Sequence, residues 1–387
     1  MKNSDYDTKY IKVLDGIRAL SILIIVWFHF WQQSWLLPYL GNISLDFIPR
    51  YGFLLVDMMI LLSSFCLFIP YARSMVYKEE MPKTKDFYIK RVARIFPSYF
   101  LSMIIALIFI ILFQKNWLNS FFVKDTIMHI FFVNNWSADT LLFTNYMVVL
   151  WTVAVEVQYY LIYPLIAKYF TKKPVLTYFI MIFIGTSCIF LIKSLSNYYN
   201  LPYYVNHFVT FIPVYANGML ASWLYILYTK DKKRTKISDL FFTLTSIALV
   251  IAYGYLCKNI TGNIQEWQLN NRLLLSVMFT VFVISTLLSC KVYQKLFNNK
   301  LMKFIAVISF NLYIYHQFIA VKLKEFRIPF YSGDTPPNML GDTKWQWTYT
   351  ILCILISLIV AIIVTYLVEK PASKFIKKKF KCSEKRL

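Results

Sequence analysis

The sequence has only nine glycines in 387 residues, and no glycine-rich phosphate loop, internal repeat or low-complexity tract interrupts it. Acidic residues are also scarce, with 19 Asp and Glu against 41 Lys and Arg. The six cysteines are scattered, so no close pair indicates a disulfide framework or a metal site. These absences argue against a P-loop nucleotide-binding protein and against a small domain stabilised by disulfide bonds. We expect one integral domain over residues 1–387, without a bound metal.

What the chain does contain is apolar. Hydrophobic residues make up 58% and aromatic residues 19% of the sequence, and the mean hydropathy is +0.53, as in a polytopic membrane protein. The net charge of +22, taken alone, is compatible with binding to nucleic acid. Basic residues gathered beside membrane spans are instead typical of cytoplasmic loops, so we expect membrane lipids and no nucleic acid as partners. The first apolar run lacks a small-residue cleavage site, which indicates a retained span.

The apolar runs predict an all-α bundle of about ten transmembrane helices, because each is long enough to cross about 30 Å of hydrocarbon. A shorter apolar segment, 121–133, contains Lys124, Asp125 and His129 and is expected to be an interfacial or re-entrant helix. The ten expected spans are 17–37, 51–71, 96–114, 146–168, 174–193, 207–228, 238–256, 272–289, 303–323 and 346–369.

Basic residues are distributed unevenly between the two sides of this predicted bundle. The side that holds both chain ends has 30 Lys and Arg, the other side has 10, and Arg18 lies at a boundary. The excess predicts a multi-pass protein of the cell membrane with both termini in the cytoplasm. The membrane core is expected over 10–371 and a basic cytoplasmic tail over 372–387.

Ionisable residues inside the spans require an explanation, because a charged side chain in hydrocarbon has a high free-energy cost. Arg18 and His29 are eleven residues apart, which places them on one helix face about 16 Å from each other. One interpretation is that Arg18 marks the membrane edge and His29 makes a packing hydrogen bond. The other is a reaction pathway through half the membrane. The expected spans bring Asp57, Glu156 and His316 to a depth similar to that of His29, so we expect them to line one cavity with it.

A second group of ionisable residues lies at the cytoplasmic start of the third expected span. Lys90 and Arg94 are one turn apart, and Arg91 and Arg94 share a neighbouring face. A forked cationic face of this kind suits phosphate groups. The simpler interpretation is contact with lipid head groups, which explains many basic juxtamembrane segments.

Together these segments resemble acyltransferase family 3, the multi-pass membrane O-acyltransferases. The resemblance covers nearly the whole chain, with its motifs in the family's order. The motifs are Leu14-Asp15-Gly16-Ile17-Arg18-Ala19 with His29 after ten intervening residues, Val56-Asp57 followed by Leu62-Ser63, the 87–99 block with Arg91 and Arg94, the 151–164 block around Glu156, Ser309 to His316, and Val368-Glu369-Lys370-Pro371.

The resemblance implies transfer of an acyl group, usually acetyl, from cytoplasmic acyl-CoA to a hydroxyl of an extracytoplasmic glycan or lipid-linked sugar in a bacterial membrane. Arg18, Arg91 and Arg94 would bind the acyl-CoA. His29 would act as a general base towards the acceptor hydroxyl, or as a nucleophile that accepts the acyl group first. Glu156 would orient His29 or stabilise its imidazolium. The acceptor and the acyl group are left open by the sequence.

Other residues receive supporting roles in this hypothesis. Glu369 is expected to be mainly structural and to have a cationic partner, because it lies near a helix C-terminus. The predicted cavity-wall residues are Asp57, Ser63, Tyr160 and His316.

A transporter or flippase of polysaccharide precursors is the alternative function, although it would be expected to contain internal repeats and broken helices.

Overall fold

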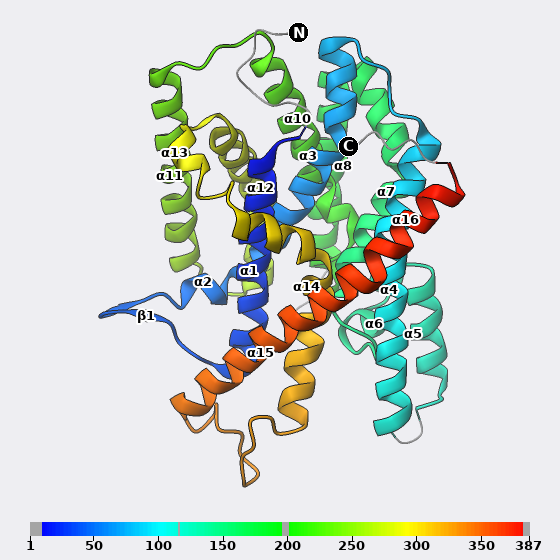
Figure 1. Ribbon diagram of the computed structural model, residues 1–387, viewed down its shortest axis with the longest axis vertical. Coiled ribbons are helices and arrows are strands. Elements are labelled where there is room, and N and C mark those ends of the chain that lie inside the picture. The colour runs from blue at the N-terminus through cyan, green and yellow to red at the C-terminus, as the bar shows by residue number, and fades with distance from the viewer. Residues whose placement is uncertain (1–9, 115–116, 196–200, 382–387) are drawn as a thin grey trace.

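The computed structural model describes residues 10–114, 117–195 and 201–381, which form a helical bundle (Figure 1). Within these ranges, ten helical segments are long and apolar enough to cross a membrane, which confirms the predicted all-α polytopic fold. They are α1 (Lys12–Ser34), η1 with α3 (Gly52–Leu54, Leu55–Tyr77), α4 (Thr84–Phe113), α7 (Leu150–Lys172), α8 (Pro174–Leu195), η3 with α10 (Phe208–Phe211, Ile212–Thr229), α11 (Lys236–Lys258), α12 (Ile264–Leu288), α14 (Lys300–Glu325), and the continuous segment of α15 (Thr343–Val364), η4 (Thr365–Glu369) and α16 (Lys370–Lys379).

Short elements connect these helices. Two two-residue strands, β1 and β2, pair antiparallel between α1 and α3, with Tyr39 opposite Ser44. We call the side on which α1 begins the N-terminal face and the other side the opposite face. The short elements are β1 (Tyr39–Leu40), β2 (Ile43–Ser44), α2 (Phe47–Arg50), α5 (Ser120–Ile130), η2 (Asn134–Trp136), α6 (Ala138–Leu142), α9 (Leu201–Val205) and α13 (Lys291–Gln294).

Two membrane helices begin at least eight residues earlier than the hydropathy predicts. Helix α4 begins at Thr84 instead of 96, and α12 begins at Ile264 instead of 272. The added turns contain charged and amide side chains such as Arg91 and Gln268, which lower the local hydropathy while they face cavities inside the bundle. Consequently, Arg272 lies eight residues inside α12 and is fully buried, rather than at a membrane edge.

Helix α5 accounts for the short apolar segment near 121–133 and lies beside α4 in Figure 1. The Tyr99 hydroxyl, near the middle of α4, donates a 2.9 Å hydrogen bond to the carbonyl oxygen of His129. The Asp125 carboxylate is fully buried and accepts hydrogen bonds from the Thr144 hydroxyl and the Asn145 amide. These contacts favour the re-entrant alternative, since the end of α5 reaches the depth of mid-α4.

The centre of the bundle depends on a close approach between α3 and α10. A Cβ on Gly218 would lie 2.6 Å from the carbonyl oxygen of Leu61, so only glycine fits this crossing. Beside it, the Ser64 hydroxyl donates a 2.7 Å hydrogen bond to the carbonyl oxygen of Tyr215. Tyr163 of α7 donates to the carbonyl oxygen of Ser64 over 3.1 Å. These contacts hold α7 and α10 against α3 at Leu61 and Ser64.

The last spanning segment is longer than expected and contains a π-turn. Helix α15 continues through Thr365–Glu369 into α16, a helical segment of 37 residues instead of the predicted 346–369. It runs obliquely across the front of the bundle in Figure 1. Part of the expected basic tail, 372–387, is therefore helical. The helical part ends at Lys379, and residues 382–387 lie outside the described residues.

Candidate active site

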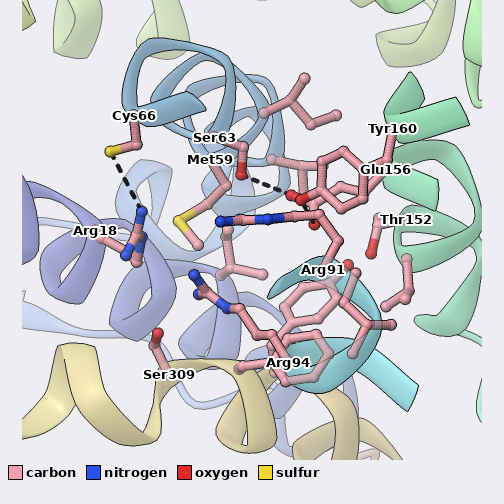
Figure 2. A pocket seen from close by; sticks show the side chains of 17 residues that line it. Arg18, Met59, Ser63, Cys66, Arg91, Arg94, Thr152, Glu156, Tyr160 and Ser309 are labelled. Atoms are coloured by element: carbon pink, nitrogen blue, oxygen red, sulfur yellow. Dashed lines mark hydrogen bonds between the residues drawn. The ribbon is translucent and has the colours of Figure 1, made fainter. Parts of the chain in front are cut away.

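A cavity of about 90 Å³, here called the inner cavity, lies between α1, α3, α4, α7 and α14 (Figure 2). Its wall combines three arginines and one carboxylate with hydroxyl groups and apolar side chains. The lining residues are Arg18, Ile25, Val56, Met59, Ile60, Ser63, Cys66, Arg91, Arg94, Ile95, Thr152, Val153, Glu156, Tyr160, Ser309, Phe310 and Tyr313.

The three arginines approach the inner cavity from two helices. Arg18 comes from α1, and Arg91 and Arg94 are three residues apart on α4, so both of the latter face the same space (Figure 2). Among the described residues, no ion pair within 4.0 Å involves any of the three. The cavity is therefore rich in positive charge, which favours an anionic ligand.

Neutral groups hold two of these guanidinium groups in place. Nη2 of Arg18 lies 3.7 Å from the sulfur of Cys66. The guanidinium of Arg91 lies over the rings of Phe87 and Tyr160, with 5.9 and 5.8 Å to their centroids. Its Nε is buried and has no hydrogen-bond partner among the residues that the structure describes. Such contacts orient an arginine without neutralising it. Donor capacity is thus left for a ligand.

Glu156 belongs to the inner cavity and is hydrogen-bonded there. Its Oε1 accepts from the Ser63 hydroxyl at 2.7 Å, and its Oε2 accepts from the Tyr160 hydroxyl at 2.9 Å (Figure 2). Arg18 and Arg91 both interact with it electrostatically at longer range. Glu156 therefore offsets part of the arginine charge and joins α7 to α3.

A second, larger cavity of about 520 Å³, here called the outer cavity, lies towards the opposite face. His29 and Asp57 are in its wall, together with aromatic and amide side chains. The lining residues are Phe28, His29, Trp31, Gln32, Arg50, Tyr51, Phe53, Val56, Asp57, Val148, Val149, Trp151, Val205, Asn206, Ile260, Gly262, Ile264, Gln265, Gln268, Tyr313 and Gln317.

The two cavities share a wall. Val56 of α3 and Tyr313 of α14 line both the inner and the outer cavity. A small group that moves past these two side chains would pass from the arginines to His29. The polar stripe predicted for α1 thus divides between adjoining cavities, with Arg18 in one and His29 in the other.

His29 lies five residues before the end of α1 and is held by its own helix. Its Nδ1 is 3.0 Å from Oε1 of Gln32. An amide oxygen can only accept, so Nδ1 carries the proton and Nε2 keeps its lone pair.

The expectation that Glu156 contacts His29 is not met, because Glu156 is bonded to Ser63 and Tyr160 in the inner cavity. The four-residue cluster expected at one depth is divided because α7 enters from the opposite face beside α3 rather than beside α1.

His316 packs behind His29 instead of lining either cavity. The two imidazole centroids are 5.0 Å apart, and His316 is fully buried. Nδ1 of His316 bonds to the carbonyl oxygens of Tyr313 and Leu312, at 2.7 and 3.1 Å. Its Nε2 has no hydrogen-bond partner within the described ranges of the chain. The ring therefore supports His29 from α14, and the predicted wall position is corrected.

Asp57 is paired with a residue that the sequence reasoning missed. Nε of Arg272 donates to its Oδ2 at 3.0 Å, and both side chains are fully buried. Nε2 of Gln268 approaches Oδ1 at 3.4 Å. Nη1 of Arg272 also bonds to the carbonyl oxygen of Val205 and the hydroxyl of Thr210. Asp57 is thus a fixed, compensated anion that ties α3 to α12 and to the segment before α10.

Glu369 is also engaged within the bundle. Nδ2 of Asn311 donates to its Oε2 at 2.6 Å and to the Thr365 hydroxyl at 2.8 Å. Arg94 and Lys370 are among the cations that act on Glu369. The carboxylate therefore links the π-turn to α14, and the cations that were expected near it include an inner-cavity arginine.

Comparison with known proteins agrees with this arrangement. A family model described as an acyltransferase domain matches residues 11–367. An O-acetyltransferase OatA of Staphylococcus aureus is 23% identical over 340 residues, which cover 84% of this chain and 53% of that protein. A peptidoglycan O-acetyltransferase OatA of Listeria monocytogenes is 26% identical over 179 residues, covering 44% of this chain and 26% of that protein. The chain spans about half the length of the Staphylococcus aureus relative. No solved structure gives a significant match.

Proposed function

Because the chain belongs to acyltransferase family 3, whose model matches residues 11–367, we propose that it is a membrane O-acyltransferase. It transfers an acyl group, acetyl in the first instance, from acyl-CoA on the cytoplasmic side to a hydroxyl of an extracytoplasmic glycan or lipid-linked sugar. The observation that carries the proposal is the cluster of three arginines in the inner cavity, none of which has a carboxylate within 4.0 Å among the described residues.

The arginines supply the binding site for the donor. Arg91 and Arg94 offer guanidinium groups from one face of α4, and Arg18 faces them from α1. Guanidinium groups bind phosphate oxygens through paired, charge-assisted hydrogen bonds. The phosphates of an acyl-CoA therefore bind at the arginines of the inner cavity, and its narrow thioester end extends past Val56 and Tyr313 towards His29.

His29 supplies the chemistry from the wall of the outer cavity. With the proton on Nδ1 held by Gln32, Nε2 is the free basic atom. As a base, Nε2 takes the proton of the acceptor hydroxyl, the hydroxyl oxygen attacks the thioester carbonyl, and the proton passes to the departing thiolate. As a nucleophile, Nε2 itself attacks the carbonyl and expels the CoA thiolate, which leaves an acyl-imidazolium. The acceptor hydroxyl oxygen then attacks the acyl carbon, Nε2 departs as free imidazole, and the hydroxyl proton passes to the thiolate.

Glu156 acts on the donor side. Its hydrogen bonds to Ser63 and Tyr160 keep a carboxylate within the arginine field, which limits repulsion among the three cations. It is therefore a positioning residue of the inner cavity rather than the partner of His29.

Acyl transfer from labelled acetyl-CoA by the purified protein in detergent tests the proposal. Wild-type protein is expected to transfer the label to an acceptor, or to hydrolyse the thioester slowly in its absence. His29→Ala is expected to bind acetyl-CoA without either reaction. Arg327→Ala, a change outside both cavities, serves as the matched control. If wild-type protein neither binds acetyl-CoA nor consumes it, the proposal fails and the transporter alternative gains support.

A further inference from the structure

The hairpin formed by β1 and β2 is apolar and lies on the outside of the bundle. Residues 35–45, which contain it, include no charged residue. Leu40 pairs with Ile43 across the hairpin, so both side chains lie on one face, and they are 68% and 64% exposed. Tyr39, on the other face, is 61% exposed. Three large exposed side chains on so small an element indicate a surface that contacts a partner rather than water.

The base of the hairpin lies close to the end of a membrane span. Helix α2 follows the hairpin and packs against α11, where a Cβ on Gly254 would lie 3.5 Å from Cε2 of Phe47. Beside this contact, the Tyr253 hydroxyl donates a 3.4 Å hydrogen bond to the carbonyl oxygen of Tyr51. Gly254 is four residues, or about 6 Å, before the end of α11 at Lys258. The hairpin therefore leaves the bundle near the boundary between hydrocarbon and head groups.

The span beside the hairpin faces lipid. The structure describes all 23 residues of α11, and two of them are buried, Ser246 and Cys257. Figure 1 shows the hairpin extending sideways from the bundle, beyond the end of α11, so it continues this lipid-facing surface. Lipid at this depth suits the hairpin, because tyrosine and aliphatic side chains are favoured at the membrane interface and no charge opposes their entry.

We propose that the hairpin inserts into the lipid leaflet at the opposite face, with Leu40 and Ile43 in contact with the acyl chains. Its partner is the bilayer itself, and the inference does not depend on acyl transfer. The hairpin joins α1 to α2, which contribute Trp31 and Arg50 to the wall of the outer cavity. Insertion therefore fixes this side of the outer cavity relative to the leaflet.

Photo-crosslinking of the full chain in lipid nanodiscs tests this inference. The photoreactive residue p-benzoylphenylalanine replaces Leu40 or Ile43, and the nanodiscs contain radiolabelled phosphatidylcholine and phosphatidylglycerol. We expect lipid adducts at both positions. Ile43→Asp should lower the adduct yield at position 40 about fivefold, because a charged side chain opposes insertion at the edge of the hydrocarbon. Ile43→Val, which keeps an apolar side chain, should leave that yield unchanged.

Two further positions supply the reference yields. The photoreactive residue at Ile251 of α11, which is 67% exposed, should give the full lipid adduct and shows that each variant is folded and embedded. At Asp334, exposed in the loop after α14, it should give little. The inference is overturned if the yields at Leu40 and Ile43 do not exceed that at Asp334, or if Ile43→Asp leaves the yield at position 40 unchanged. Cross-links from the hairpin to a second copy of the chain, in place of lipid, would overturn it as well.

Discussion

Nε of Arg272 donates a hydrogen bond to Oδ2 of Asp57 over 3.0 Å, and neither side chain is exposed to solvent. Removing one partner of such a pair leaves an uncompensated buried charge, which typically costs about 3–5 kcal/mol. Arg272→Met should therefore lower the midpoint of thermal unfolding in detergent strongly. The double variant Asp57→Leu with Arg272→Met should recover much of the loss, since it leaves no buried charge.

Arg327→Met provides the comparison, because its guanidinium lies over the Tyr331 ring in the loop after α14 and takes part in no ion pair within 4.0 Å in the described part of the chain. It should shift the midpoint little. An Arg272→Met protein as stable as the wild type would contradict a structural role for the buried pair.

Replacing Arg91 and Arg94 together by alanine should weaken acetyl-CoA binding by at least tenfold. Each charge-assisted hydrogen bond to a phosphate contributes about 1.5–3 kcal/mol. Lysine at both positions should restore only part of the affinity, because an ammonium group cannot form the paired contacts of a guanidinium group. Equilibrium binding of labelled acetyl-CoA measures the effect. Unchanged affinity would assign these arginines to lipid head groups.

His29→Ala should reduce acyl transfer by about 10²–10⁴-fold, the usual contribution of a general base, while acetyl-CoA affinity persists. Glu156→Gln should act mainly on the affinity for acetyl-CoA, because Glu156 contacts Ser63 and Tyr160 in the inner cavity. Since the two residues lie in different cavities, their effects on kcat/KM should multiply in the double variant. A double variant no worse than His29→Ala alone would show that they act as one unit.

The distribution of basic residues predicts which side of the membrane each loop occupies. A reporter that is active only outside the cytoplasm should be silent when fused after Lys233, which follows α10. The same reporter fused near Gly333, which follows α14, should be active. The reverse result would place the arginines of the inner cavity outside the cytoplasm and remove the proposed route for acyl-CoA.

The sequence predicts the number of spans well because long apolar runs are a strong signal, and the short helix α5 also stands out by its length. It predicts the ends of the spans poorly where polar side chains face a cavity. Arg272 illustrates the difficulty. The hydropathy of the sequence places Arg272 at the edge of an expected span, as for a loop residue. In the structure it is buried within α12 against Asp57. Only the pairing, which depends on the packing of α3 against α12, reveals its environment.

In the candidate site, contacts within one helix follow from the sequence, whereas contacts between helices depend on how the helices pack. Helical spacing correctly puts Arg91 and Arg94 on one face, and the inner cavity brings Arg18 to them. Spacing cannot say which helices are neighbours, so similar depth alone suggested a contact between His29 and Glu156. Two missed contacts are local, and the sequence pattern could have indicated them. They are the bond from His29 to Gln32, three residues along α1, and the bond from Tyr160 to Glu156, four residues along α7.

The length of the last helical segment bears on the depth of the proposed donor site in the membrane. At about 1.5 Å per residue, 37 residues extend about 55 Å, well beyond about 30 Å of hydrocarbon. Its final ten residues, α16, include five lysines and pack against α4, which carries Arg91 and Arg94. A basic helix of this kind resides at the level of the lipid head groups, where each lysine gains about 1 kcal/mol from anionic lipid. Because α16 packs against α4, we expect its position among the head groups to set the height of the two arginines relative to the membrane surface. The lipid composition of the leaflet should then affect how acyl-CoA reaches them.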